Sequence, residues 1–147
     1  MNKYVHGYSE YEANRLNDQA DSLAELLHYD SIWEDGSNIL EVGCGIGAQT
    51  KIIAPKNRNS KFVSIDISSE SLNQARNIAD SNRIDNVAFQ QADIFELPFA
   101  DEYFDHIFIS FVLEPIPNPM KALSKLKRVL KKNGTITLIE GDHGSAY

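Results

Sequence analysis

The most informative segment of this chain is Asn38-Ile-Leu-Glu-Val-Gly-Cys-Gly-Ile-Gly-Ala48. Residues 38–42 form a short, mostly apolar run, which is typical of a buried strand. Three alternating glycines follow, and a helix is predicted from about residue 48 to 54, where Pro55 helps to stop it. A helix that begins behind such a loop presents free N–H groups and a positive dipole end, which favour a carboxylate or a phosphate.

Strands and helices alternate from this loop onward. Further strands are predicted at residues 61–65, 87–91, 104–111 and 135–139. Ser68 or Ser69 can cap one helix, and a second helix follows Pro117 and Pro119 and ends at Asn133-Gly134. The predicted inward-facing residues are Leu72, Ala75, Ile78 and Ala79 in the first of these helices, and Met120, Leu123, Leu126 and Leu130 in the second.

This alternation predicts an α/β fold, namely a Rossmann-like doubly wound parallel sheet with helices on both faces. The predicted sheet ends after its fifth strand. Before the glycine loop, apolar residues recur at helical spacing and predict an amphipathic helix over about residues 10–28. We therefore expect two parts, an N-terminal helical segment at residues 1–36 and a Rossmann-like core at residues 37–147.

Composition narrows the classes of protein that fit. The 147 residues, 42% of them hydrophobic, suit one domain with a single core. A net charge of -7 gives no general attraction to nucleic acid or to an anionic membrane. Cys44 is the only cysteine, so the sequence indicates neither a disulfide nor a zinc–thiolate site, and we predict no metal site. No signal peptide and no apolar stretch of roughly 18 residues are visible, so the predicted location is the cytoplasm.

The glycine loop alone does not identify its ligand. Gly43, Gly45 and Ala48 also fit the dinucleotide pattern G-x-G-x-x-A, so NAD binding is an alternative. Asp66 ends the second strand, 19 residues after Gly47, where a carboxylate can accept both hydroxyls of a ribose in either cofactor. Asp93 follows the third strand, where it could accept from an adenine amino group. An NAD site gives no particular reason for that second acid.

With these residues in view, the sequence resembles the class I S-adenosylmethionine-dependent methyltransferases. It is most similar to the small-molecule group that includes the ubiquinone and menaquinone biosynthesis methyltransferases. The resemblance covers roughly residues 38–140 and rests on ILEVGCGIG, VSIDIS, QADIFELPFADEYFDHIF and LKRVLKKNGTITLIE. It implies S-adenosyl-L-methionine as the cofactor. The glycine loop, residues 43–47 with Gly43, Cys44, Gly45 and Gly47, would line the methionine portion, and Glu41 would help to orient it.

The resemblance also assigns roles beyond the glycine loop. Asp66 would hold the ribose hydroxyls while Ile67 packs on the adenine, and Asp93 would accept from the adenine amino group with Ile94 beside it. The remaining cofactor residues that it implies are Ser110 and Phe111, which would border the methionine amine, and Tyr8, which lies in an N-terminal cover. For the tyrosines of that segment, ordinary packing is an equally open interpretation.

The methyl group of the cofactor is already activated, so the protein's main contribution is expected to be alignment of the reactants. A general base is needed only if the acceptor must lose a proton, and the candidates are Glu114, Asp142 and His143. No Asn-Pro-Pro-Tyr-like motif follows the fourth strand, and the lysines of residues 121–132 are most simply a solvated helix face. We therefore predict a small-molecule methyl acceptor, with no nucleic-acid and no membrane partner.

The chain departs from the family pattern at its C-terminal end. The family sheet usually continues into an antiparallel hairpin, so we expect a truncated or partial chain. A fifth strand without a neighbour at residues 135–139 leaves an open edge, which invites self-association. Two other functions stay open: an NAD-binding oxidoreductase fragment, and a non-catalytic cofactor-binding module.

Overall fold

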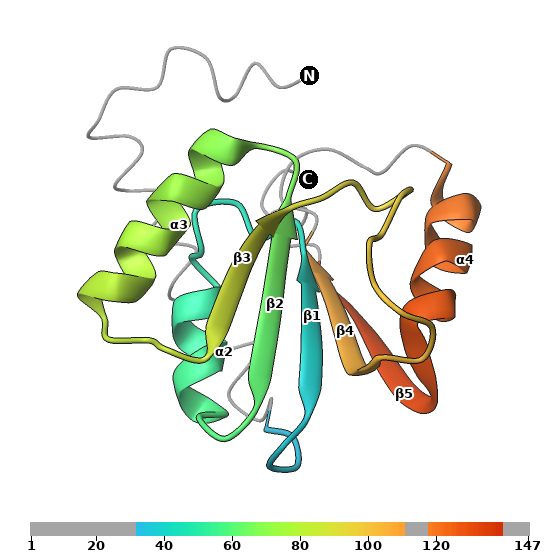
Figure 1. Ribbon diagram of the computed structural model, residues 1–147, viewed down its shortest axis with the longest axis horizontal. Coiled ribbons are helices and arrows are strands. Elements are labelled where there is room, and N and C mark those ends of the chain that lie inside the picture. Colours follow the sequence, from blue (N-terminus) through green and yellow to red (C-terminus); the bar gives the residue numbers. More distant parts are fainter. Residues whose placement is uncertain (1–31, 111–117, 140–147) are drawn as a thin grey trace, which may run out of the picture.

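Five parallel strands form one sheet in the part of the chain that the computed structural model describes, residues 32–110 and 118–139. The strands are β1 (Asn38–Val42), β2 (Lys61–Asp66), β3 (Val87–Gln91), β4 (Phe104–Ser110) and β5 (Leu130–Ile139). Their order across the sheet is β3-β2-β1-β4-β5, and every neighbouring pair is parallel (Figure 1). The predicted Rossmann-like parallel sheet is thereby confirmed.

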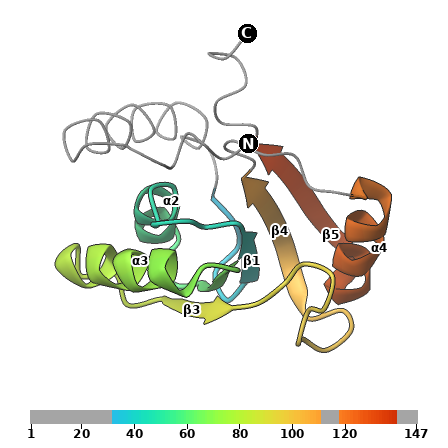
Figure 2. The same cartoon turned by 90° about the horizontal axis from the view of Figure 1, so that it is seen from above.

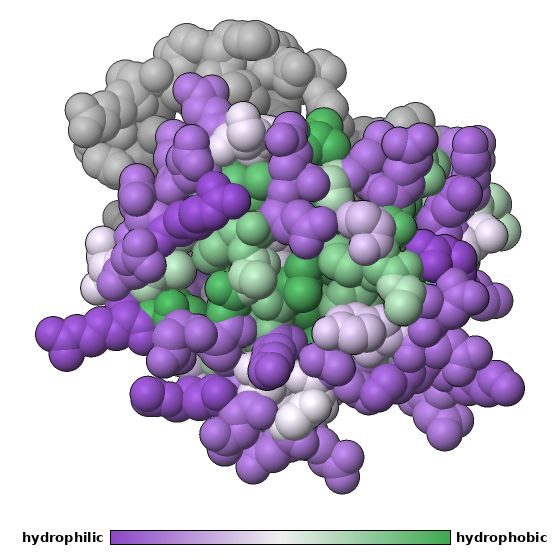
Figure 3. Space-filling view, in the orientation of Figure 1, coloured by the Kyte–Doolittle hydropathy of each residue, from purple (hydrophilic) through white to green (hydrophobic). Residues whose placement is uncertain are grey.

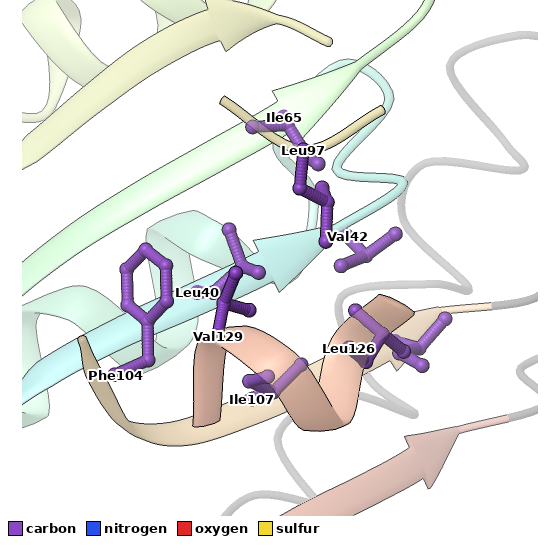
Figure 4. Close-up of a cluster of buried hydrophobic side chains, with 9 residues drawn as sticks. Leu40, Val42, Ile65, Leu97, Phe104, Ile107, Leu126 and Val129 are labelled. Atoms are coloured by element: carbon purple, nitrogen blue, oxygen red, sulfur yellow. The ribbon is translucent and has the colours of Figure 1, made fainter. Parts of the chain in front are cut away.

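Helices cover both faces of this sheet, as predicted. They are α2 (Thr50–Lys56), α3 (Ser69–Ser81) and α4 (Pro119–Val129). Because successive residues of a strand point to opposite faces, β1 contributes to two cores. Ile39 packs with residues of α2, whereas Leu40 and Val42 pack with Leu126 and Val129 of α4 (Figures 2 and 4).

The order of the strands places a switch point beside β1. The chain runs outward from β1 through β2 to β3 and then returns to β4 on the other side of β1. The loops that follow these strands therefore meet at the carboxyl edge of the sheet, where ligands of such folds bind. The glycine loop that follows β1 lies at this switch point. Viewed on one face, apolar side chains gather over the middle of the sheet and hydrophilic side chains surround them (Figure 3).

Two predicted helix ends were wrong. Helix α2 continues to Lys56, so Pro55 lies in its last turn rather than stopping it. Helix α4 ends at Val129, and Leu130 already adopts extended backbone angles and pairs with Phe104. Strand β5 thus begins five residues before the predicted start at Thr135. Asn133-Gly134 is not a helix cap but part of a register shift between β4 and β5.

Gly134 allows the close contact that this register shift requires. A Cβ atom at Gly134 would lie 2.5 Å from Leu130 Cδ1 and 2.9 Å from the carbonyl oxygen of Asp105. Both distances are shorter than a carbon–carbon or carbon–oxygen contact permits. Asn-Gly after a helix predicts a helix end. Here the glycine instead allows two backbone segments to approach closely.

The predicted inward face of α4 was half wrong. Leu126 is buried as predicted, but Met120 is 74% exposed and Leu123 is 39% exposed. The buried residues of α4 are Ala122, Leu126 and Val129. This set also has helical spacing, and the small Ala122 is what lets the helix sit close to the sheet. The prediction favoured the larger side chains, although their positions face away from β1 and β4.

The helix α3 follows the prediction closely. Ser68 is its N-cap, and its hydroxyl oxygen accepts from the backbone N–H of Ser71 at 3.1 Å. Leu72, Ala75 and Ala79 are buried. No helix among residues 32–110 and 118–139 is long and apolar enough to cross a membrane.

Asn86, which precedes β3, is hydrogen-bonded to the end of α2 and to the turn that leads into β2. Its Nδ2 lies 2.9–3.2 Å from the carbonyl oxygens of Ala54, Asn57 and Ser60. We expect Asn86→Ala to lower the free energy of unfolding by about 2 kcal/mol, because the buried hydrogen bonds of the side-chain amide to these carbonyls are lost. Urea denaturation measures the change. Asn73→Ala, on the exposed side of α3, serves as the control and should cost well under about 1 kcal/mol; equal losses would refute the role of Asn86.

His106 is a buried packing residue. Its ring stacks at 4.4 Å on that of Trp33, its Nδ1 is hydrogen-bonded to the Thr135 hydroxyl, and its Nε2 lies 3.2 Å from the Thr137 hydroxyl. Burial lowers the pKa of His106 to about 4. This histidine is therefore neutral in the folded protein over most of the physiological pH range.

We expect His106 to make the fold sensitive to acid. The unfolded chain takes up the histidine proton near pH 6.5 and the folded chain only near 4, so stability falls as pH drops between these values. The measurement is the difference in urea midpoint between native protein and His106→Gln at pH 7 and at pH 4.5. The difference should shrink at the lower pH. A difference that stays constant between the two pH values would contradict the assignment.

Candidate cofactor site

The glycine loop is held by hydrogen bonds to β2. The backbone N–H groups of Gly43 and Cys44 both donate to the carbonyl oxygen of Ile65, at 2.9 and 3.1 Å. Gly43, Gly45 and Gly47 have φ angles of 77°, 55° and 89°. Positive φ is the conformation that glycine adopts without a steric cost, which explains why three glycines alternate here. The loop therefore has a fixed shape at the carboxyl edge of the sheet.

Asp66 connects this loop to the next one. The Gly45 N–H donates to Asp66 Oδ2 at 2.8 Å, and the Ser68 N–H donates to Oδ1 at 2.9 Å. Both carboxylate oxygens are thus oriented by backbone donors. Each oxygen can still accept a further hydrogen bond, since an ionised carboxylate offers about four acceptor positions. Asp66 can therefore receive ligand hydroxyls without leaving its place.

Glu41 is fully buried beneath the loop. The hydroxyls of Thr50 and Ser64 donate to its Oε1, at 2.5 and 2.6 Å. Its Oε2 has no hydrogen-bond partner within the described parts of the chain. Burial raises the pKa of Glu41, the two hydroxyls oppose that rise, and the charge of Asp66 adds to it. The site thus contains an acceptor with an unused oxygen.

Two candidate cofactor residues, Ile67 after β2 and Asp93 after β3, are exposed to solvent. Ile67 has 71% of its surface exposed although it is a large apolar residue, and the Gln91 side-chain amide donates to its carbonyl oxygen at 2.9 Å. Asp93 is exposed as well, and its Oδ1 accepts from the Phe95 N–H at 2.9 Å. Ile94 is partly buried against the core. The exposed apolar side chain of Ile67 and the carboxylate of Asp93 thus follow neighbouring strands. Such a pair can pack on the face of a planar ring and accept a hydrogen bond from its polar edge.

Cys44 is a packing residue of the loop. It is buried, and burial together with the charge of Asp66 raises the pKa of its thiol. A protonated, buried thiol is a poor nucleophile and a poor metal ligand. Within residues 32–110 and 118–139 no group of three His, Cys, Asp or Glu side chains is arranged to hold a metal ion.

The structure brings some of the predicted site residues together and does not describe others. Glu41, the glycine loop and Asp66 form one hydrogen-bonded unit with β2, and Ile67, Asp93 and Ile94 follow at the ends of β2 and β3. Ser110 ends β4, where its backbone pairs with Ile139. The predicted residues that lie outside the described ranges are Tyr8, Phe111, Glu114, Asp142 and His143.

Two residues that contact Glu41, Thr50 and Ser64, are not among the predicted site residues. The sequence contains a feature that could have indicated Ser64, because this serine interrupts the apolar residues of β2. In the sheet register it lies directly opposite Glu41. Thr50 carries no such signal. It stands in the first turn of α2, and only the fold of the glycine loop brings it within reach of Glu41.

Comparison with known proteins finds related sequences and structures. A family profile described as a methyltransferase domain matches residues 34–146. A ubiquinone/menaquinone biosynthesis C-methyltransferase of Vibrio vulnificus is 37% identical over an alignment of 110 residues. This alignment covers 71% of this chain and 41% of that protein. The enzyme of the same name from Rickettsia prowazekii is 32% identical over 143 residues, covering 86% of this chain and 58% of that one.

Solved structures show the same fold. A SAM-dependent methyltransferase from Aquifex aeolicus matches with a TM-score of 0.69 and 24% identity, covering 84% of this chain and 68% of that structure. This likeness supports the fold. The chain spans less than two thirds of the length of either biosynthetic relative.

Proposed function

Because the chain belongs to the methyltransferase domain family, we propose that it binds S-adenosylmethionine at the carboxyl edge of its sheet and takes part in methyl transfer to a small-molecule acceptor. One observation carries the proposal. The Gly45 N–H donates to Asp66 at 2.8 Å, so two features that the sequence suggested separately form one site. The unused Oε2 of buried Glu41 fits a ligand that brings a positive charge or a donor.

The proposed roles follow the order of the strands. The glycine loop lines the methionine portion, with Glu41 as an acceptor beneath it. Asp66 accepts the ribose hydroxyls, and its fixed position supports that role. Ile67 offers its exposed side chain to the adenine, while Asp93 faces the adenine amino group and Ile94 supports the ring.

When bound, the cofactor supplies a methyl group on a positively charged sulfur, which a nucleophilic atom of the acceptor can displace directly. The protein's residues bind and align the reactants. Cys44 is buried and its thiol holds its proton, so it is unsuited to serve as a nucleophile. Glu114, Asp142 and His143 remain the proposed candidates for a base. The names of the relatives specify C-methylation, whereas the proposal for this chain extends only to a small-molecule acceptor.

The family favours methyltransferase function over NAD-dependent oxidation. A non-catalytic module is the second candidate, since every role that we propose for the described residues concerns the cofactor and none concerns the acceptor. We also propose residues 1–36 as a segment that covers the cofactor, residues 37–147 as the core, and the cytoplasm as the location. Neither a nucleic-acid nor a membrane partner is proposed.

Self-association through β5 is a further part of the proposal. The strand pairs only with β4 in the described parts of the chain. An open groove of about 560 Å³ lies next to it, where Leu123, Leu130 and Ile136 meet the side chains of Lys127 and Lys131. An unpaired strand edge beside apolar side chains favours pairing with another chain.

Calorimetric titration with S-adenosylhomocysteine, with NADH in parallel, tests the proposed cofactor. Saturable binding of the thioether and none of NADH is the expected result. Binding of NADH instead, or of neither ligand, would refute the proposal. If the thioether binds, methyl transfer to candidate acceptors separates the enzyme from the non-catalytic module.

A further inference from the structure

Glu41 occupies an unusual position for a carboxyl group. It lies in the central strand β1, between Ser64 of β2 and Phe108 of β4 in the sheet register, and it is fully buried. Burial of a charged carboxylate is costly without compensating partners. The charge that acts on it is that of Asp66, which is also negative. The surroundings of Glu41 therefore favour its neutral, protonated form.

Both hydrogen-bond donors of Glu41 converge on the same oxygen. The Thr50 hydroxyl approaches Oε1 from α2 and the Ser64 hydroxyl approaches it from β2, at 2.5 and 2.6 Å. Two donors from different elements prevent the carboxyl group from turning over. They leave Oε2 as the oxygen without a partner among the described residues. The arrangement fixes one oxygen and keeps the other available.

Glu41 directly precedes the proposed methionine site along the chain. The glycine loop begins two residues after Glu41, and the loop is the part of the site that we assign to the amino-acid portion of the cofactor. That portion carries an ammonium group. A carboxylate that meets an ammonium group is favoured in its charged form, which reverses the preference of the free protein.

We propose that Thr50 and Ser64 are positioning residues that hold Glu41 with Oε2 toward the ammonium group of the cofactor, and that Glu41 gives up a proton when this group binds. The inference rests on the proposed function. The O–H bond of the carboxyl group breaks, the proton passes to the solvent, and a carboxylate–ammonium pair forms. Cofactor binding therefore strengthens as pH rises.

Burial raises the pKa of Glu41, which supports this direction. The folded protein holds the proton more tightly than the unfolded chain. The contribution of Glu41 to stability is therefore fully present below the ordinary glutamate pKa and is lost as pH rises through the raised value. Glu41→Gln removes this dependence, so its urea midpoint should change less with pH than that of the native protein. This measurement needs no ligand.

The decisive experiment is calorimetry of S-adenosylhomocysteine in buffers with different ionisation enthalpies, which counts the protons released. Titrations between about pH 5 and 9 begin just above the ordinary glutamate pKa, and release should approach one proton per bound ligand at pH values where the free protein still holds the Glu41 proton. The matched ligand is 5′-methylthioadenosine, which lacks the amino-acid portion and should release none. The matched protein is Glu41→Gln, which should release none with either ligand.

Variants of the two hydroxyls test their positioning role. Thr50→Val and Ser64→Ala should each weaken binding by about tenfold and shift proton release to higher pH, because a donor to Glu41 is lost. Thr50→Ser should restore both. Ser60→Ala is the control, since Ser60 is also buried but its hydroxyl donates to the backbone carbonyl oxygen of Glu34. This variant should lower stability and leave proton release unchanged.

The outcomes separate the two proposals. Binding of S-adenosylhomocysteine without proton release at any pH in this range would overturn the inference and leave the proposed function intact. Unchanged affinity and proton release in both hydroxyl variants would overturn the positioning role. Absence of binding by the native chain would overturn the proposed function and the inference together.

Discussion

Asp66→Ala should weaken binding of S-adenosylhomocysteine at least about 100-fold, which corresponds to roughly 2.7 kcal/mol. The substitution removes the acceptor that we assign to the ribose hydroxyls. It also leaves the N–H groups of Gly45 and Ser68 without the carboxylate oxygens that they contact at 2.8 and 2.9 Å. Ligand binding and loop shape are therefore lost together. Calorimetric titration at one pH and salt concentration measures the effect.

Asp66→Asn should be nearly as damaging despite its shape. An asparagine has one acceptor oxygen, whereas the N–H groups of Gly45 and Ser68 occupy both oxygens of Asp66. Its NH2 group would face one of these donors. Asp80→Ala, at an exposed position of α3, is the control and should bind normally. If Asp66→Asn binds as the native protein does, Asp66 does not hold the ribose.

The sequence was sufficient to predict the order of strands and helices because each core element carries its own periodic pattern. Ile39 and Leu40 of β1 point to opposite cores, and such a strand is apolar on both faces. The cap of α3 at Ser68 was equally local. The loop and Asp66 could also be predicted as a site, since parallel strands bring their carboxyl ends to one edge.

Features that depend on contacts between distant residues could not be predicted. The end of α4 depends on the pairing of Leu130 with Phe104 in β4, which no window of sequence around Gly134 contains. The hydroxyl of Thr50 contacts Glu41 only after the glycine loop has folded. The exposure of Met120 depends on which face of α4 packs against the sheet, namely the face of Ala122, Leu126 and Val129. In each case the deciding contact is tertiary.

Gly47→Ala should impair both folding and binding. Gly47 has a φ angle of 89°, and a Cβ atom there would lie 3.3 Å from the Cβ of Ala75 in α3. The backbone strain costs about 1–2 kcal/mol, and overpacking against α3 adds roughly 1–3 kcal/mol. The loop must move away from Ala75 to relieve the contact, so we expect affinity for S-adenosylhomocysteine to fall more than about tenfold. Urea denaturation and calorimetry measure the two effects.

Gly36→Ala provides a matched control for backbone strain. Gly36 has a similar φ angle of 85°, but a Cβ atom there would meet nothing within 4 Å. It should cost only the strain, about 1–2 kcal/mol, and leave binding unchanged. Ala75→Gly removes the opposing Cβ, so the Gly47→Ala/Ala75→Gly double variant should recover part of the lost affinity, which a double-mutant cycle detects. The contrary outcome has two parts: the effects in that cycle are additive, and Gly47→Ala lowers stability and affinity no more than Gly36→Ala does. In that case contact with α3 does not set the shape of the cofactor loop.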